Sequence, residues 1–149
     1  MQGHGFSASQ IADIVRDLVT RTPLGAAMSS YDVVVSHLHL IYAGRPVEEF
    51  HCLFLDRKNM LIECRLMGVG TVDHVPVYPR EVLKAALLLD ASAIILSHNH
   101  PSGDPTPSAT DIQMTNLVND GCQAIGITLH DHVIIGNGRD YSLRAAGDF

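Results

Sequence analysis

Residues 92–111 read SAIILSHNHPSGDPTPSATD, and they combine the patterns of a strand, a stiff loop and the start of a helix. The first seven of them form an almost continuous apolar run, which is typical of a central strand covered on both faces. The following loop is rich in Pro and Gly, and Ser108 and Asp111 have the spacing of a capping box that opens a helix. The segment therefore predicts a covered sheet in an α/β domain.

Helical spacing of apolar residues and capping patterns predict four helices. The first opens at a capping box of Ser7 and Gln10, and the second at a box of Ser29 and Asp32. The third begins with Pro79, a residue type that is favoured at the first helical position. The predicted helices cover residues 7–19, 29–42, 79–89 and 108–119. On the last of them, the side chains expected to face inward are Met114, Leu117 and Val118.

Apolar runs between turn signals predict the strands of one sheet. Two of these runs are separated by Arg57, Lys58 and Asn59, which indicates a β-hairpin. The order of elements mixes hairpins with helix crossovers, and this favours an α/β fold with a mixed β-sheet flanked by helices. The predicted strands cover residues 49–56, 60–68, 71–77, 92–98, 127–136 and 141–143.

Length and composition favour one folded domain. The chain has 149 residues, of which 46% are hydrophobic and 17% are charged, a balance typical of a folded protein. No domain boundary is visible within residues 27–149, so this range is predicted to be one domain that follows an N-terminal helical extension, residues 1–26. The three cysteines stand far apart in apolar surroundings and are predicted to be reduced core residues.

Charge and hydropathy argue against two classes of partner. The net charge is -6 and the ten Lys and Arg residues are scattered, so nucleic acid is a disfavoured ligand. No apolar run approaches the roughly 20 residues that cross a bilayer. The first ten residues also lack the basic and apolar regions of a signal peptide. We therefore expect no membrane association and a cytoplasmic location.

His98, His100 and Asp111 are the leading candidates for a metal site. A catalytic zinc ion takes three protein ligands from His, Asp, Glu or Cys and keeps a fourth position for water. If the two histidines continue or follow the strand, side chains two residues apart point to the same side and can hold one ion. The prolines of the loop fix backbone angles, so the chain can turn back and offer Asp111 from the first turn of the next helix.

Two further His-x-His pairs are weaker candidates. His37 and His39 fall on a predicted helix, where a step of two residues is about 200° and the rings diverge. His130 and His132 fall on a predicted strand and can share a face, with Asp131 pointing the opposite way. No carboxylate at a helix start follows that pair, so His132 is expected in the core or beside the metal site.

The run HNHPSGDPTPSATD, from His98 to Asp111, resembles the signature of the RadC family, a branch of the JAMM (MPN+) metalloprotease superfamily. That signature is His-x-His, seven residues, Ser, two residues and Asp. The resemblance covers roughly residues 45–144, and it implies an MPN/JAMM fold of the cytidine-deaminase-like type with zinc at a strand end. Further matching segments are EEFHCLFLD (48–56), Gly70-Thr71, YPREV (78–82) and DHVIIG (131–136).

The resemblance also implies roles for individual residues. An upstream glutamate would be the general acid/base: Glu48 is the predicted residue, because Phe50 matches a Glu-x-Phe pattern of the family, and Glu49 is the alternative. Ser108 would donate to the tetrahedral intermediate, although its hydroxyl also fits a helix N-cap. Asn99 stands where JAMM isopeptidases usually have Ser or Thr, so deubiquitinase chemistry is not inferred. The implied zinc ligands are His98, His100 and Asp111.

The predicted function is that of a zinc-dependent metallopeptidase or related amide hydrolase acting on a peptide or protein. Zinc would lower the pKa of water to about 7, Glu48 would take the proton, and zinc with Ser108 would stabilise the oxyanion. Two alternatives stay open. One is a DNA-repair-associated factor or nuclease, which the charge disfavours, and the other is a non-catalytic zinc-stabilised interaction module, which a fourth protein ligand would favour. The substrate's identity and the oligomeric state are not predicted.

Overall fold

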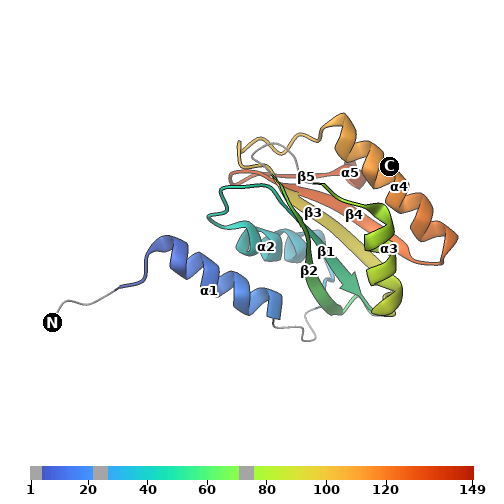
Figure 1. The fold of residues 1–149 in the computed structure, drawn as a ribbon, viewed down its shortest axis with the longest axis horizontal. Helices are drawn as coiled ribbons and strands as arrows, with labels where there is room; N and C mark the ends of the chain where they lie inside the picture. Colours follow the sequence, from blue (N-terminus) through green and yellow to red (C-terminus); the bar gives the residue numbers. More distant parts are fainter. Residues whose placement is uncertain (1–4, 22–26, 71–75) are drawn as a thin grey trace.

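The computed structural model describes residues 5–21, 27–70 and 76–149, which form an α/β arrangement (Figure 1). The helices are α1 (Ala8–Arg21), α2 (Tyr31–Tyr42), α3 (Pro79–Leu88), α4 (Ala109–Ala124) and α5 (Leu143–Ala146). The strands are β1 (Glu49–Leu55), β2 (Leu61–Val69), β3 (Ala93–Asn99), β4 (Thr128–Ile135) and β5 (Asp140–Ser142).

The described strands form one sheet in the order β2-β1-β3-β4-β5. β1 and β2 are the predicted hairpin, and β1 also pairs antiparallel with β3 on its other side. β3 and β4 are parallel because α4 carries the chain back between them, whereas β5 returns antiparallel beside β4. The sheet is therefore mixed, and the predicted fold class of a mixed sheet flanked by helices is confirmed.

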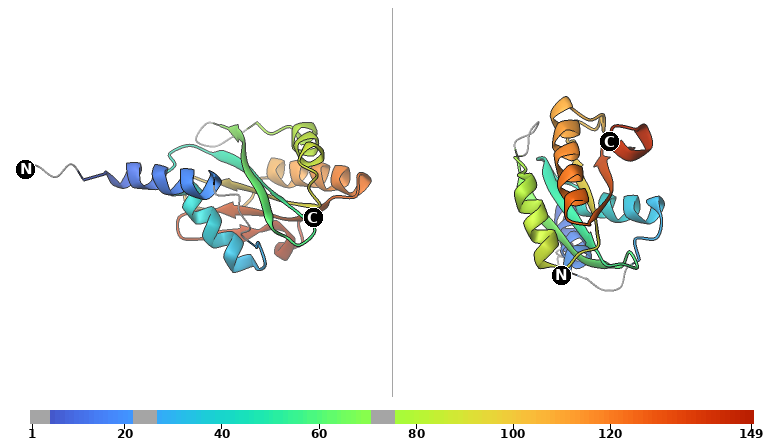
Figure 2. Two further views of the ribbon diagram at one scale, coloured as in Figure 1. Left: turned by 90° about the horizontal axis from the view of Figure 1, so that it is seen from below. Right: turned by 90° about the vertical axis from the view of Figure 1, so that its right-hand side faces the viewer.

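Helices cover both faces of this sheet (Figure 2). α2 packs on one face, whereas α3 and α4 pack on the other. β1 and β3 are buried along their whole length, as expected of central strands that are covered on both faces. The three cysteines are buried and unpaired in these layers, as predicted. The candidate site lies on the face covered by α3 and α4, where β3 ends.

α1 contacts α2 and β2 and extends away from the rest of the chain at one end (Figure 1). Ser7 and Gln10 form the predicted capping box, with the Gln10 N–H donating to Ser7 Oγ at 3.2 Å and the Ser7 N–H donating to Gln10 Oε1 at 2.8 Å. Asp13 on this helix pairs with Arg45 at 3.0 Å. Within the described parts of the chain, no helix is long and apolar enough to cross a membrane.

Two helix predictions need correction. α2 is capped by Ser30, whose side chain accepts from the Val33 N–H, and not by Ser29. α4 continues five residues beyond the predicted end at Asn119, and Leu117 is 60% exposed instead of facing inward. Spacings of three and four residues place one stripe of the helix against the sheet and leave Leu117 on the solvent side. The buried residues of that stripe are Thr115, Val118 and Cys122.

The two short strand predictions had different outcomes. The strand predicted near residues 71–77 falls mostly on residues 71–75, which lie outside the described residues. The segment predicted as a strand over residues 141–143 is β5 followed directly by α5, a helix that the sequence pattern did not indicate. Ser142 ends the strand and caps the helix, because its Oγ accepts from the Ala145 N–H at 3.0 Å.

Candidate metal centre

The two histidines of the central motif lie at the end of β3. His98 is the last but one residue of the strand and is only 1% exposed, with its ring stacked on Phe50 at a centroid separation of 5.9 Å. His100 follows the strand, and its Nδ1 lies 2.8 Å from the carbonyl oxygen of Asp104. The two Nε2 atoms are 2.9 Å apart. The end of the strand therefore places the two histidine side chains on the same side, as predicted.

Asn99, between the two histidines, points away from them and fixes the start of β1. Its Oδ1 accepts from the Glu49 N–H at 2.7 Å, and its Nδ2 donates to the Val47 carbonyl at 3.1 Å. These two bonds hold the backbone on both sides of Glu48. The side chain of Glu48 points toward the histidines, and its Oε1 lies 3.5 Å from His98 Nε2.

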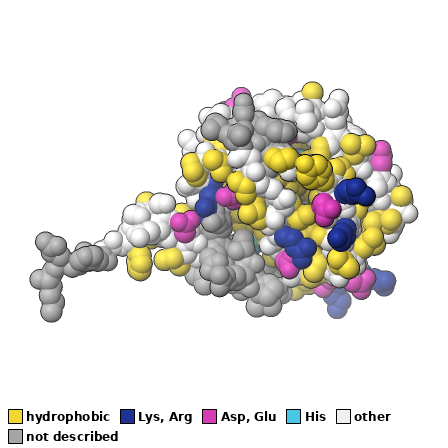
Figure 3. Space-filling view, viewed as in Figure 1, with side chains coloured by type: hydrophobic (Ala, Val, Ile, Leu, Met, Phe, Trp, Pro, Cys, Tyr) yellow, Lys and Arg dark blue, Asp and Glu magenta, His cyan; other side chains and the backbone are white. Residues whose placement is uncertain are grey.

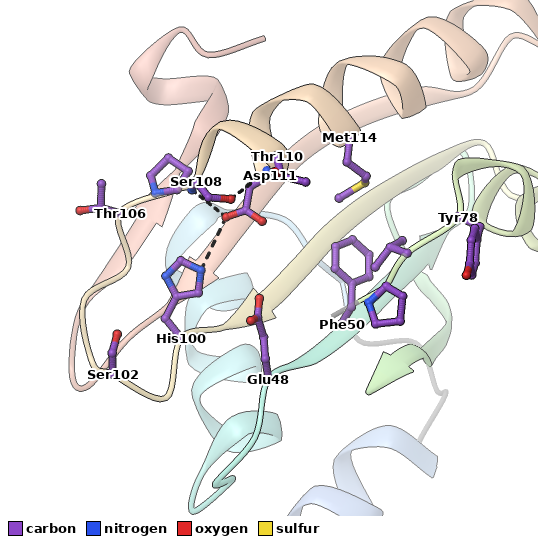
Figure 4. A pocket seen from close by; sticks show the side chains of 13 residues that line it. Glu48, Phe50, Tyr78, His100, Ser102, Thr106, Ser108, Thr110, Asp111 and Met114 are labelled. Carbon is purple, nitrogen blue, oxygen red and sulfur yellow. Dashed lines mark hydrogen bonds and ion pairs between the residues drawn. The ribbon is translucent and has the colours of Figure 1, made fainter. Parts of the chain in front are cut away.

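Asp111 reaches the same place from the first turn of α4. Its Oδ2 lies 3.4 Å from His98 Nε2 and 3.6 Å from His100 Nε2. The same oxygen accepts from the Ser108 N–H at 2.8 Å, and Ser108 Oγ accepts from the Asp111 N–H at 3.1 Å, so the predicted capping box is formed. His98 therefore lies close to both Glu48 and Asp111, and Asp111 also lies close to His100. Figure 4 shows the side chains of Glu48, His100 and Asp111 at this place.

The charge states follow from these contacts. Burial alone would raise the pKa of Asp111, but the neighbouring rings of His100 and His98, which can donate when protonated, and the Ser108 N–H outweigh it and hold this pKa well below its usual range. Burial would likewise lower the pKa of His100, yet the protonated ring can donate to both Asp111 and the Asp104 carbonyl, which raises this pKa overall. The site thus holds a carboxylate that favours a positive charge beside it.

The donor set fits a metal cation. A carbonyl oxygen can only accept, so Asp104 takes the Nδ1–H of His100 and the neutral His100 ring presents the lone pair of its Nε2. That lone pair faces His98 Nε2 and Asp111 Oδ2, and Glu48 Oε1 lies beside His98 Nε2. Ligand atoms of Glu48, His98 and His100 lie within 4.8 Å of one another. Nitrogen and carboxylate donors crowded in this way repel one another unless a cation lies among them, and zinc prefers such ligands.

A cavity of about 680 Å³ opens beside this cluster (Figure 4). Phe50, Tyr78 and Met114 form an apolar wall on one side of Glu48, whereas Ser102, Thr106 and Ser108 lie on the other side with their hydroxyls. Among the described residues that line the cavity, none is Lys or Arg. The remaining described lining residues are Pro76, Val77, His100, Pro107, Thr110 and Asp111.

Neither of the other two histidine pairs is brought together on one face to form a second site. His37 and His39 are on α2, which covers the opposite face of the sheet. His130 and His132 do not share a face, contrary to the prediction, because β4 contains an irregularity in its pairing with β3 after Leu129. His130 binds Asn59, with Nε2 at 2.8 Å from Oδ1, whereas the fully buried His132 turns toward His98.

Comparison with known proteins identifies the family. A family model described as "RadC-like JAB domain" matches residues 28–148. The chain belongs to this family. RadC-like relatives include a "UPF0758 protein" of Rhodobacter capsulatus, 54% identical over 134 residues that cover 90% of this chain and 61% of the relative. Another UPF0758 protein, from Ruegeria pomeroyi, is 56% identical over 120 residues, which cover 80% of this chain and 54% of the relative.

The chain thus spans a little over half the length of these curated relatives, and their names state no activity. The family predicted from the His98 to Asp111 run is confirmed. In this RadC-like domain, Glu48 lies at the cluster while Glu49 pairs with Arg45 at 3.6 Å. Sequence reasoning missed Thr115, a polar residue on the buried stripe of α4; its spacing of four from Asp111 was the available signal.

Proposed function

We propose that this domain is a zinc-dependent amide hydrolase of the JAMM type. The observation that carries the proposal is the convergence of two histidine nitrogens and two carboxylates at the mouth of a cavity. His98, His100 and Asp111 would hold the ion, which when bound would supply Lewis acidity that lowers the pKa of water and polarises a carbonyl. The chain spans only part of the length of its relatives. The activity of a full-length relative is therefore a proposal in the same way.

Glu48 is the proposed general base. Glu48 is only 4% exposed as a residue and lines the cavity, so its carboxylate can take a proton from water beside the cluster and deliver it to a leaving amine. The backbone clamp by Asn99 fixes where this carboxylate stands.

The proposed role of Ser108 uses the proton of its hydroxyl. The oxygen accepts from the Asp111 N–H as a helix cap, and no described residue accepts a hydrogen bond from this hydroxyl. Its proton is thus available to an oxyanion that forms in the cavity, which Ser108 lines. One hydroxyl can serve as cap and as donor at once, since the two functions use different atoms.

Replacing Ser108 by Ala should slow hydrolysis by roughly 10²-fold or more, the usual effect of losing one oxyanion donor. Loss of the cap should also destabilise the fold by about 1 kcal/mol. Steady-state kinetics, zinc content and thermal unfolding separate these effects. Ser108→Thr, which keeps both the donor and the acceptor, is the control and should retain activity. A Ser108→Ala variant that is less stable but fully active would restrict this residue to capping.

The cavity favours an uncharged amide substrate. Its apolar wall of Phe50, Tyr78 and Met114 suits an apolar side chain next to the scissile bond. A phosphodiester would find no Lys or Arg among the described lining residues, although such side chains are the usual partners of phosphate. We therefore propose a peptide or protein substrate and rank the nuclease alternative below it.

Duplex DNA should bind only feebly at physiological salt. On the face seen in Figure 3, Lys and Arg side chains are interspersed with Asp and Glu, and the net charge of the chain is -6. Neither feature provides the counterion release that drives non-specific binding. Fluorescence anisotropy of a labelled duplex checks this. A tight complex whose affinity falls steeply with salt would contradict the expectation and promote the DNA-linked alternative.

A specific observation favours the non-catalytic zinc module as the second candidate. Glu48 Oε1 lies 3.5 Å from His98 Nε2, nearly as close as the 3.4 Å of Asp111 Oδ2. If Glu48 were a fourth ligand, the site would be closed and structural. Hydrolysis of a peptide library by the zinc-loaded chain, with a chelated sample as the blank, tests the catalytic proposal directly.

A further inference from the structure

Three hydrogen-bonding contacts connect two of the proposed ligands behind the site, and two of these contacts are buried. Thr115 Oγ1 donates to the Asp111 carbonyl at 2.7 Å and lies 2.6 Å from His132 Nδ1. His132 Nε2 lies 2.8 Å from His98 Nδ1. The side chains of Thr115 and His132 are fully buried, and His98 is 1% exposed. Asp111 and His98 are therefore joined through two side chains that do not themselves face the proposed ion.

The direction of every bond in this chain follows from its first acceptor. A carbonyl oxygen cannot donate, so the Thr115 hydroxyl gives its proton to Asp111 and offers its lone pair to His132. His132 must then carry its proton on Nδ1, which leaves Nε2 as an acceptor for the Nδ1–H of His98. The neutral His98 ring consequently has no proton on Nε2, the atom that faces His100, Asp111 and Glu48.

We propose that His132 and Thr115 are positioning residues that hold His98 in the tautomer whose Nε2 lone pair is directed into the metal site. This inference rests on the proposed function for its consequence, because the tautomer matters once a cation is bound. It also ties the ring of His98 to the backbone of Asp111, so that two ligands from different elements are held in one arrangement.

The fold supplies this arrangement through β4 and α4. The pairing irregularity after Leu129 turns His132 to the face on which His98 lies, and the parallel register places His132 opposite Leu96. Thr115 stands one helical turn beyond Asp111 on α4. Phe50 covers both rings, stacked on His98 and edge-on to His132 at a centroid separation of 5.5 Å. Water therefore has little access to the two rings and cannot easily replace a hydrogen-bond partner that a substitution removes.

Removing the Thr115 hydroxyl should favour the opposite tautomers. In Thr115→Val the Nδ1–H of His132 would face a methyl group, and a buried donor without a partner is unfavourable. The pair can avoid this by moving the protons, so that His132 Nε2–H donates to His98 Nδ1 and His98 carries its proton on Nε2. That proton finds acceptors in the nearby carboxylates, but it occupies the position that a metal ion needs.

The first test is the tautomeric state of the rings in the full chain, read from long-range ¹⁵N–¹H correlation spectra of metal-free and zinc-loaded protein. The expected result for His132 is a proton on Nδ1 and a bare Nε2 in both samples, and for His98 a proton on Nδ1 in the zinc-loaded sample. In metal-free Thr115→Val, His132 should carry its proton on Nε2. A wild-type His132 protonated on Nε2 would overturn the proposal.

The second test is zinc affinity, measured by competition with a chromogenic chelator. Thr115→Val should weaken zinc binding roughly 10- to 100-fold, the usual effect of removing a partner of a ligating histidine. Thr115→Ser, which keeps the hydroxyl, should restore it. Ser97→Ala is the matched control, because this variant also loses one buried hydroxyl, which donates to the Val133 carbonyl at 2.8 Å on the other face of the sheet. It should bind zinc like the wild type.

Unchanged affinity in a folded Thr115→Val protein would refute the positioning role, and so would equal losses in Thr115→Val and Ser97→Ala, which would indicate a general effect of a missing hydroxyl. Thermal unfolding of the metal-free variants shows whether each is folded. A wild-type chain that binds no zinc would refute the proposed function alone, and the tautomers of His98 and His132 in the metal-free protein would then still decide the inference.

Discussion

Glu48→Gln should slow amide hydrolysis strongly while the protein keeps its fold and its zinc. The amide is nearly isosteric with the carboxylate and still forms hydrogen bonds, but it cannot accept a proton from water. We expect a loss of roughly 10²-fold or more in rate, the range found for general-base residues. Hydrolysis assays on the variant, combined with elemental analysis for zinc, measure both quantities in the same sample.

Glu49→Gln is the matched control, because it makes the same chemical change one residue further along. Glu49 pairs with Arg45 on the other side of the strand, so this variant should keep its activity. Activity that survives Glu48→Gln but disappears in Glu49→Gln would mean that the strand presents its other face to the cluster. Loss of zinc in Glu48→Gln would instead make this residue a ligand and favour the closed, non-catalytic site.

Asp111→Ala should lose nearly all of its bound zinc, and activity should fall with it. A carboxylate contributes both a ligand atom and the negative charge that offsets the cation, and two histidines alone hold zinc poorly. Elemental analysis should give about one zinc per chain for the wild type and far less for the variant. Zinc content unchanged by the substitution would place the ligands elsewhere.

The same aspartate also closes the capping box with Ser108, so fold stability has to be separated from metal binding. Asp111→Asn serves this purpose, because its amide oxygen can still accept from the Ser108 N–H. We expect this variant to keep most of its metal-free stability yet to bind zinc more weakly than the wild type. Comparison of metal-free unfolding curves for both variants isolates the loss of the cap, which should amount to about 1 kcal/mol.

The strand, loop and helix over residues 92–111 could be predicted because their signals are local. A continuous apolar run, a proline-rich loop and the pair Ser108 and Asp111 each report on neighbours only a few residues away. The hairpin of β1 and β2 was predictable for the same reason, since Arg57 to Asn59 separate two apolar runs. These elements are the ones that bring His98, His100 and Asp111 together.

The remaining part of the site depends on contacts that a local pattern does not contain. The irregularity in β4 separates His130 from His132, and it appears only once β4 has paired with β3. Thr115 is a polar residue in a buried stripe, so a search for apolar spacing selected Leu117 instead. In physical terms, a buried hydroxyl is tolerated where its hydrogen bonds are satisfied, and that condition is tertiary.

The clamp formed by Asn99 has a consequence for how this protein acquires its metal. It joins residues 50 positions apart, so Glu48 stands beside the histidines only after β1 has been laid against β3. Closing a segment of that length is entropically unfavourable, and such pairings form slowly compared with local turns and helices. A nascent chain would therefore present the histidine motif well before the glutamate is in place. Metal captured that early would be held by an incomplete pocket, and the finished arrangement would arise as one of the last events of folding.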